Sequence, residues 1–406
     1  MRVLIVGSGG REHALAWRLG RDGGSNEIHA APGNPGIAAL GTCHPVRAED
    51  GEGLLELARA LGIELVVIGP EAPLVAGVAD RLRHGGVPVF GPSAAAARIE
   101  GSKSFAKDVL AAAGVPTVAV LDVPAPPCVV KADGLAAGKG VFVCGTQAEL
   151  DGALSAAAAF GGPVVVEELL EGEELSVFAL CDGSSTLPLA AARDYKRAAD
   201  GDTGPNTGGM GSFSPVPGFG AREVEELVDR IHAPVVEELA RRAAPFVGVL
   251  FAGLMLTADG PRVLEFNCRF GDPETQSILP RLDGDPAAAL AAAAAGDLRG
   301  VRLETSDRVA VTVVVTAGGY PERGDAGSAI EGIDAAERLG ALVFHGGTAR
   351  SGDRLVTDGG RILGVTGVGG DLEQARALAY EGVAAISFDG ARHRTDIALP
   401  EAVGVA

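Results

Sequence analysis

The sequence predicts a multidomain protein of mixed α/β and α+β class, with an N-terminal parallel α/β domain and a small C-terminal α/β domain. Three observations predict it. The length of 406 residues suits two to four domains. Apolar runs alternate with amphipathic stretches over the first hundred residues, as in a parallel sheet covered by helices. Strands in hairpin-like order follow. The expected domains are 1–101, 102–307, with a mobile subdomain at about 126–191, and 308–406.

The N-terminal domain is predicted from three buried strands and the helices between them. The strands are expected at Arg2–Val6, Glu64–Ile68 and Val87–Phe90, and the helices at 11–19, 54–61 and 74–82. Ligands of such a sheet bind beyond the carboxyl ends of its strands. The Gly- or Pro-containing turns at 7–10, 31–34 and 69–71 are therefore the expected binding edge.

The middle region has shorter strands and one long polar segment. The polar segment, 193–217, has little periodicity, and unstructured loops of that length are usually functional or disordered. Pro234 is expected to kink or divide a helical stretch over Ala221–Arg242. The expected strands are Cys128–Lys131, Val141–Cys144, Val164–Glu167, Leu175–Leu180, Val249–Thr257 and Arg262–Asn267. The last hundred residues add strands at Val309–Thr316, Leu342–Phe344 and Ile362–Thr366, and a helix at Leu372–Ala385.

Charge and composition exclude several classes of function. Thirty-four basic and 53 acidic residues give a net charge of −19, which argues against nucleic acid or an anionic membrane as a partner. No apolar run reaches 18 residues, and the N-terminal run of four, Val3 to Val6, is too short for a signal-peptide core. Five cysteines without a C-x-x-C spacing indicate buried thiols in a cytoplasmic protein. We expect a monomer that acts on small molecules.

Two glycine-rich loops resemble phosphate-binding motifs without matching them. In the first, Gly7-Ser8-Gly9-Gly10-Arg11-Glu12, Glu12 stands where a dinucleotide fingerprint has Gly or Ala. A phosphate monoester at this helix start and an ordinary tight turn both stay open. The second, Lys131 to Gly140, lacks the spacing and the Ser or Thr of a P-loop. It is either a cationic loop that approaches phosphates or a hairpin with solvated lysines.

One predicted strand carries a candidate metal site. Strict alternation over Leu264–Arg269 places Glu265, Asn267 and Arg269 on one face. A carboxylate and an amide oxygen two residues apart suit Mg²⁺, which keeps its other positions for phosphate and water. Arg269 is placed to stabilise charge on a transferred phosphoryl group. The alternative is a half-exposed strand with scattered polar side chains. For the separate acidic stretch Glu167–Glu174, the alternative is an ordinary acidic linker.

With these motifs together, the chain resembles the ATP-grasp enzymes, and among them the phosphoribosylamine–glycine ligases. The resemblance runs from residue 1 to about 370. It is most specific at Lys131-Ala132-Asp133-Gly134-Leu135-Ala136-Ala137-Gly138-Lys139-Gly140-Val141, at 202–211, and at Glu265-Phe266-Asn267-Cys268-Arg269-Phe270-Gly271-Asp272-Pro273-Glu274. It implies that ATP phosphorylates the carboxylate of glycine and that 5-phosphoribosylamine attacks the acyl phosphate. The products would be glycinamide ribonucleotide, ADP and phosphate, in de novo purine biosynthesis.

The resemblance also implies roles for residues. Arg269, Asp202 and Asn206 would be catalytic, and Glu265 and Asn267 would bind Mg²⁺ or Mn²⁺. ATP would be held by Lys103, Lys131, Gly138, Lys139, Gly140, Glu167, Glu168, Leu170 and Glu174. The substrates would be held by Gly9, Gly10, Arg11, Glu12, Asn34, Glu71, Gly208, Gly209 and Met210.

Two other functions stay open. One is a different ATP-grasp ligase or carboxylase of purine metabolism, and segment 202–211 would distinguish it. The other is a nucleotide-binding protein without turnover, because Phe160-Gly161-Gly162 is shorter than the glycine-rich flap of its relatives. The strand Ala252-Gly253-Leu254-Met255 also lacks an acid that many ATP-grasp enzymes place there, so one metal ligand is expected from elsewhere.

Overall fold

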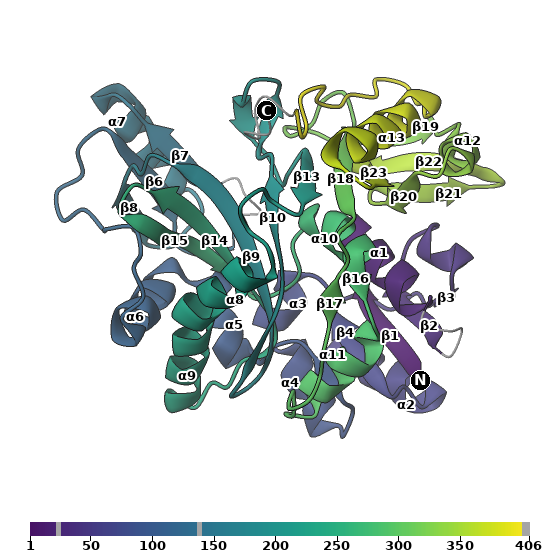
Figure 1. Ribbon diagram of the computed structural model, residues 1–406, viewed down its shortest axis with the longest axis horizontal. Helices are drawn as coiled ribbons and strands as arrows, with labels where there is room; N and C mark the ends of the chain where they lie inside the picture. Colours follow the sequence, from purple (N-terminus) through teal and green to yellow (C-terminus); the bar gives the residue numbers. More distant parts are fainter. Residues whose placement is uncertain (22–25, 136–139, 400–406) are drawn as a thin grey trace.

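The computed structural model describes residues 1–21, 26–135 and 140–399. Its N-terminal part is a five-stranded parallel sheet in the order β3-β2-β1-β4-β5 (Figure 1). The strands are β1 Arg2–Gly7, β2 Glu27–Pro32, β3 Thr42–Cys43, β4 Leu65–Ile68 and β5 Val89–Phe90. The helices are α1 Gly10–Leu19, α2 Gly51–Leu61, α3 Glu71–Val75, α4 Val78–His84, α5 Ala94–Gly101 and α6 Lys103–Ala113. The predicted parallel sheet is confirmed.

The single helix predicted over 74–82 is wrong. The chain forms α3 and α4 instead, and Gly77 between them has a φ of +83°. A residue in this left-handed region ends one helix, and glycine adopts it without steric cost.

A small sheet in the order β7-β6-β8 stands apart from the rest, at the upper left of Figure 1. Its strands are β6 Cys128–Ala132, β7 Val141–Cys144 and β8 Val164–Glu168, and α7 Gln147–Ala158 covers one face. Buried side chains of these elements, Val130 and Leu150 among them, form a hydrophobic cluster separate from the two larger clusters of the chain. The small sheet therefore has a core of its own.

The central feature is an eight-stranded antiparallel sheet in the order β15-β14-β9-β10-β13-β18-β23-β20. Its strands are β9 Glu173–Asp182, β10 Thr186–Asp194, β13 Gly211–Ser214, β14 Val247–Thr257, β15 Gly260–Asn267, β18 Val309–Thr316, β20 Leu342–His345 and β23 Arg361–Gly369. The pairing of β13 with β18 carries this sheet across residue 308. The middle and C-terminal segments thus share one sheet, and the expected domain boundaries stay predictions.

The polar segment 193–217 contains a two-stranded ribbon, β11 Arg197–Ala199 and β12 Thr203–Asn206, before β13 begins. The helical stretch after it is divided as Pro234 indicated, into α8 Ala221–Leu227, the π-helical turn η2 Val228–His232 and α9 Ala233–Arg241. The other elements are η1 Ile37–Ala39, α10 Glu274–Ile278, η3 Leu279–Arg281, β16 Leu282–Asp283, α11 Pro286–Ala294, β17 Glu304–Thr305, β19 Asp325–Ala329, α12 Ile333–Arg338, β21 Thr348–Ser351, β22 Arg354–Gly359 and α13 Leu372–Ala385.

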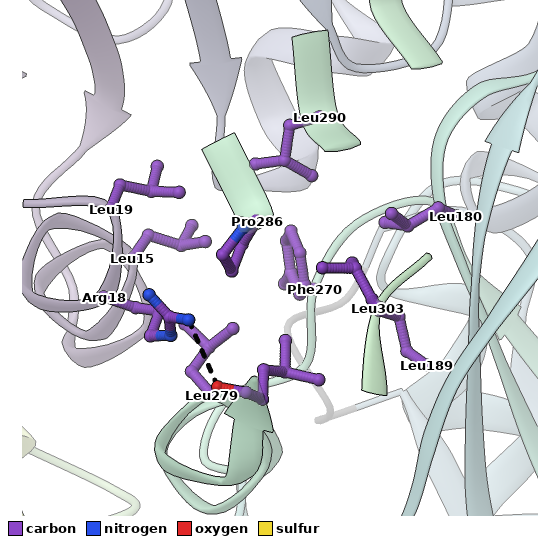
Figure 2. Close-up of a pocket in the computed structure, with 11 residues that line it drawn as sticks. Leu15, Arg18, Leu19, Leu180, Leu189, Phe270, Leu279, Pro286, Leu290 and Leu303 are labelled. Carbon is purple, nitrogen blue, oxygen red and sulfur yellow. Dashed lines mark hydrogen bonds between the residues drawn. The ribbon is translucent and has the colours of Figure 1, made fainter. Parts of the chain in front are cut away.

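The interior between α1, η3 and α11 is apolar and closely packed. Leucines from these elements surround Phe270, and Arg18 at the edge donates to the carbonyl of Leu282 (Figure 2). The remaining cavity has a volume of only about 10 Å³, so this region holds the layers together and offers no room for a ligand. The five cysteines are free thiols, four of them buried. Among the described helices, none is long and apolar enough to span a bilayer.

Candidate active site

A cleft of about 880 Å³ opens between the β15 edge of the large sheet, the small sheet and the N-terminal turns. It gathers most of the residues that the sequence singled out. Those lining it are Arg11, Glu71, Lys103, Lys131, Gly140, Glu167, Glu168, Leu170, Glu174, Asp202, Asn206, Gly208, Glu265, Asn267 and Arg269. Segments more than 200 residues apart in the chain therefore meet at one site.

Six predicted residues of the described chain are not among those that line the cleft. Five of them are buried, Gly10, Glu12, Asn34, Gly209 and Met210, and Gly9 is half-buried. Gly138 and Lys139 fall outside the described residues.

A buried carboxylate organises the lysines on the small-sheet side. Glu167 on β8 lies between two ammonium groups, with Nζ of Lys107 at 2.7 Å from Oε1 and Nζ of Lys131 at 2.6 Å from Oε2. The contact with Lys131 is one of charge, since the hydrogen bond of that ammonium goes to the carbonyl of Leu264 at 3.1 Å. Lys107 also donates to Thr117 and Val118 at 2.9 and 2.7 Å, which uses all three of its donors. Lys107 was not predicted, because nothing in its own helix marks it.

Glu265 lies on β15 at the floor of the cleft. Burial acts to raise the pKa of this carboxyl, but the positive charges of Lys196, Lys131, Lys103 and Arg269 outweigh it and hold the pKa below its usual range. Glu265 is therefore a carboxylate near neutral pH. Asn267, two residues further along the strand, is buried and lines the same cleft.

Arg269 is held by two acids from the N-terminal segments. Its Nε lies 3.2 Å from Oε2 of Glu71 and its Nη2 lies 3.1 Å from Oε1 of Glu100. Glu100 also accepts the backbone N–H of Cys268 at 2.7 Å. Burial acts to lower the pKa of Arg269, and these carboxylates raise it above its usual range. Glu100 was not among the residues predicted from the sequence.

A second charged pair lies across the cleft, where Nζ of Lys196 is 2.5 Å from Oε2 of Glu174. Close to it, Asp194 has a pKa raised to about 7, first by burial of its carboxyl and then by the negative charges of Glu274, Glu174 and Glu265 against the opposing charge of Lys196. Asp194 is the last residue of β10 and Lys196 stands two residues further on, and that spacing was the available signal for them.

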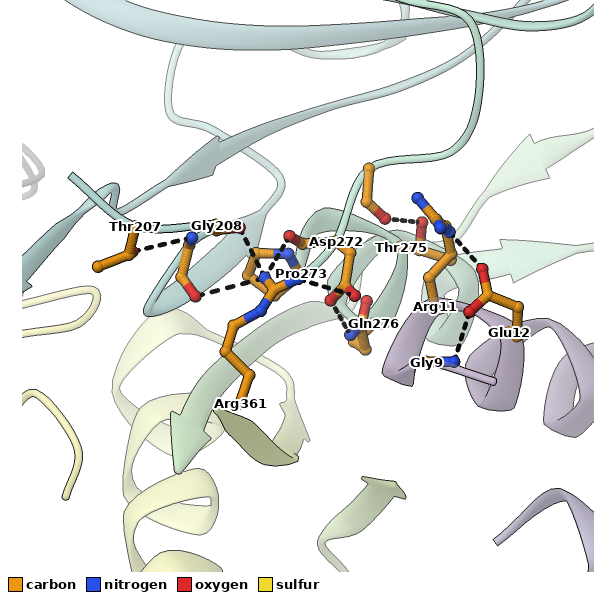
Figure 3. Close-up of polar contacts among 12 residues, drawn as sticks. Gly9, Arg11, Glu12, Thr207, Gly208, Asp272, Pro273, Thr275, Gln276 and Arg361 are labelled. Atoms are coloured by element: carbon orange, nitrogen blue, oxygen red, sulfur yellow. Dashed lines mark hydrogen bonds and ion pairs between the residues drawn. The ribbon is translucent and has the colours of Figure 1, made fainter. Parts of the chain in front are cut away.

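The first glycine turn is filled by a side chain of the protein itself. Oε2 of Glu12 accepts the N–H of Gly9 at 2.6 Å and Oε1 pairs with Nε of Arg11 at 2.5 Å (Figure 3). A Cβ atom on Gly69 would lie 2.0 Å from Oε1 of Glu12. Glu12 thus occupies the place that a dinucleotide phosphate would need, as its position in the motif indicated.

Asn34 is used inside the protein. Its Nδ2 donates to the carbonyls of Ser8 and His345, both at 2.8 Å, and its Oδ1 accepts from the N–H of Ile37 at 2.9 Å. Because the side-chain amide of Asn34 already makes these hydrogen bonds, only the backbone of Asn34 is left to bind a substrate.

Asp272 joins three segments in the wall of the cleft. Its carboxylate lies 3.1 Å from Nη2 of Arg361 and accepts from Nε2 of Gln276 at 2.8 Å (Figure 3). Arg361 also donates to the carbonyls of Gly208 and Asp272, each at 2.6 Å. Burial acts to raise the pKa of Asp272, but the charges of Arg361 and Arg11 hold it below the usual range. The C-terminal segment thereby supports the loop that bears Gly208.

A cleft with facing lysines on one side and a carboxylate–amide–arginine strand on the other defines an ATP-grasp ligase. Family models agree: "Phosphoribosylglycinamide synthetase, N domain" matches residues 1–100, the "ATP-grasp (A) domain" of that synthetase matches 101–275 and its "C domain" matches 310–400. The chain belongs to the phosphoribosylglycinamide synthetase family.

Individual relatives agree as well. The phosphoribosylamine–glycine ligase of Streptomyces coelicolor is 51% identical over 99% of this chain and 100% of its own length. That of Rhizobium meliloti is 46% identical over 98% of both chains. The crystal structure of the Thermotoga maritima ligase superposes with a TM-score of 0.84 at 35% identity, over 98% of this chain and 100% of the other. A biotin carboxylase domain from Hydrogenobacter thermophilus shares the fold at 17% identity and a TM-score of 0.68.

Proposed function

We propose that this protein ligates glycine to 5-phosphoribosylamine at the cost of ATP, giving glycinamide ribonucleotide, ADP and phosphate through a glycyl phosphate, a step of de novo purine biosynthesis. Family membership over nearly the whole chain supports the reaction. The observation that carries the assignment of the site is that Glu265, Asn267 and Arg269 line the same cleft as Lys103 and Lys131.

The small-sheet side of the cleft is the proposed nucleotide site. Lys103 and Lys131 would bind the phosphates, together with Gly140. Residues Glu167, Glu168 and Leu170 would hold adenine, and Glu174 would accept from the ribose hydroxyls. In the structure the Glu167 carboxylate is taken up by two lysines, so the backbone of β8 is the part of that residue that is left for the base.

Glu265 and Asn267 fit a divalent cation. They offer one ionised carboxylate and one amide oxygen, and the described residues contain no group of three or more His, Cys, Asp or Glu that could hold an ion by itself. That donor set suits Mg²⁺ or Mn²⁺ shared with phosphate oxygens and water. When bound, the ion would neutralise charge on the transferred phosphoryl group.

Arg269 is the proposed cation beside the acyl phosphate. Because Glu71 and Glu100 hold its guanidinium in place, the positive charge is oriented before the reaction begins, which is the condition for electrostatic stabilisation of a transition state. Asn206 and the turn at Gly208–Met210 would line the glycine and amine pocket, with Arg11 and Glu71 on its N-terminal side. No protein nucleophile is needed, since the phosphoryl group supplies the leaving group.

We place this reaction in the cytoplasm, where free thiols such as these five stay reduced. The monomeric state expected from the sequence also stays a prediction.

ADP release by the purified protein tests the function. We expect release that depends on glycine and on 5-phosphoribosylamine, the latter formed in the assay from ribose 5-phosphate and ammonia. Replacing glycine by bicarbonate or formate should abolish it. Release with either replacement would favour a different ATP-grasp ligase, and ATP binding without product would favour a protein that has lost turnover.

A further inference from the structure

We infer that Arg394 is a positioning residue, which holds the loop 195–211 in place at the mouth of the cleft, and that Asp202 is its anchor rather than a group that touches the reacting atoms. The inference rests on the proposed function for its kinetic consequences. The contacts that carry it are independent of that function.

Arg394 has 1% of its surface exposed and is the largest fully buried side chain of the described chain. Its Nη1 lies 2.7 Å from Oδ1 of Asp202 and donates to the carbonyl of Arg197 at 3.1 Å. Its Nε and Nη2 bind the two carboxylate oxygens of Asp396 at 2.7 and 2.6 Å. The guanidinium also lies 4.9 Å from the centre of the Tyr195 ring. One side chain thus joins Tyr195, and both the first strand and the turn of the β11–β12 hairpin (residues 197–206), to the C-terminal segment.

The neighbours of Arg394 strengthen this attachment. The backbone N–H of Thr395 donates to Oδ1 of Asp200 at 2.8 Å, and the N–H of Gly201 donates to Asp396 at the same distance. The N–H of Ala398 donates to the hydroxyl of Tyr195 at 2.9 Å. The segment 394–398 therefore binds the loop at several points between residues 195 and 202. Nearly 200 residues separate the two segments in the chain.

Asp202 is held in a conformation that other residues rarely adopt. Its φ is +52°, in the left-handed region that costs energy for a residue with a Cβ atom. Such a conformation persists when surrounding contacts impose it, and the contact here is Arg394. Because the Asp202 carboxylate already pairs with this guanidinium, it is poorly placed to act as a base or to bind an ammonium group of a substrate.

The far end of the loop reaches the site. The N–H of Thr207 donates to the carbonyl of Lys196 at 2.8 Å, and the N–H of Met210 donates to that of Tyr195 at 2.7 Å. Lys196 in turn pairs with Glu174 in the cleft. A shift of the hairpin would therefore displace Lys196 and the proposed substrate turn, while the lysines of the small sheet would keep their positions.

Four variants test the inference: Arg394→Ala, Arg394→Lys, Asp202→Asn and the double variant Arg394→Ala with Asp202→Asn. We expect Arg394→Ala and Asp202→Asn each to raise KM for glycine or the amine roughly tenfold, as the loss of one charged hydrogen bond implies. The Kd of ATP measured by calorimetry should change less than about twofold. The double variant should be no worse than Arg394→Ala alone, and Arg394→Lys should recover part of the loss. Arg222→Ala, in an exposed ion pair with Glu226, is the matched control.

Hydrogen exchange gives a readout that does not depend on activity. Backbone amides in 195–211 should exchange faster in Arg394→Ala than in the wild-type protein. The increase should be smaller in Asp202→Asn, which should fold normally because the side chain of Asp202 is exposed. Unchanged exchange in Arg394→Ala would overturn the inference. So would a hundredfold loss of kcat in Asp202→Asn with unchanged exchange, since Asp202 would then act in the chemistry. If the wild-type protein releases no ADP with glycine and the amine, the proposed function fails while the exchange data still decide the anchoring.

Discussion

The ammonium of Lys131 lies 2.6 Å from Oε2 of Glu167, and both side chains are almost completely buried in the wall of the cleft. The same carboxylate is bound on its other side by Lys107. Glu167 would thus keep a partner if Lys131 turned toward a polyphosphate. On the proposed function, Lys131 is the lysine that binds phosphate and Lys107 is the structural one.

Lys131→Met should weaken ATP binding by tenfold or more, on the order of one charge-assisted hydrogen bond. Unfolding free energy should fall by less than the roughly 3–5 kcal/mol typical of a broken buried pair, because Glu167 keeps Lys107. Calorimetric titration with ATP and urea unfolding measure the two effects. Lys107→Met is the matched variant, and an equal loss of ATP affinity there would contradict the distinction.

Glu265→Gln should reduce turnover roughly a hundredfold or more, since a metal that neutralises phosphoryl charge is worth several kcal/mol. The fold should be kept, because the amide matches the carboxylate in shape. ADP release over a magnesium titration measures it, with Glu226→Gln on the protein surface as the control. A wild-type rate would refute the metal assignment.

Stability should fall steeply below neutral pH because of buried histidines. Burial lowers the pKa of His13 to about 3 and that of His345 to about 4, with smaller contributions from the charges of His345 and Arg350 respectively. His232 is likewise lowered to about 4, chiefly by burial. These rings stay neutral in the folded state while the unfolded chain takes up protons below about pH 6.5. The stability is thus fully present above that pH and is lost as pH falls toward 4.

Each such histidine adds a slope of about 1.4 kcal/mol per pH unit in that window. His13→Asn should therefore flatten the pH dependence of the unfolding free energy between pH 6.5 and 4.5 by about one such slope. Urea unfolding at several pH values measures it, and the exposed His84→Asn is the control. An unaltered slope would mean that His13 is protonated in the folded protein.

Gly69→Ala should destabilise the protein by about 1–3 kcal/mol, the usual cost of overpacking, since the new methyl group would meet the fixed carboxylate of Glu12. Gly152→Ala should have the opposite effect on stability. It lies within α7 with nothing within 4 Å of a new Cβ, so it should stabilise that helix by up to about 1 kcal/mol. Thermal melts of both variants compare them, and a neutral Gly69→Ala would show that Glu12 moves freely.

Local patterns predicted part of the elements, while β2, β10, α6 and α7 were not predicted. Alternation and apolar runs act within a few residues, so strands such as β18 and the face of β15 that carries Glu265 followed from them. The long-range partners did not follow. Nothing in the spacing around Arg269 indicates that Glu71 and Glu100 hold it, and nothing near β13 indicates that it pairs with β18.

Polar residues in turns were the hardest to interpret. An asparagine after Pro-Gly looks the same in a sequence whether it faces a ligand or, like Asn34, binds carbonyls of its own chain. The same holds for Asp202, which segment 202–211 suggested as catalytic and which the structure pairs with Arg394. Only the positions of residues far along the chain separate these possibilities.

The separate hydrophobic cluster of the small sheet has a consequence for how the enzyme fails on heating. The cluster around Val130 is separate from the other two and is the smallest of the three. We therefore expect the small sheet to unfold first on heating, independently of the rest of the protein. The nucleotide would lose its lysine-bearing wall while the large sheet is still intact. Catalysis should then cease several degrees before the bulk of the molecule denatures, and bound ATP should narrow that gap.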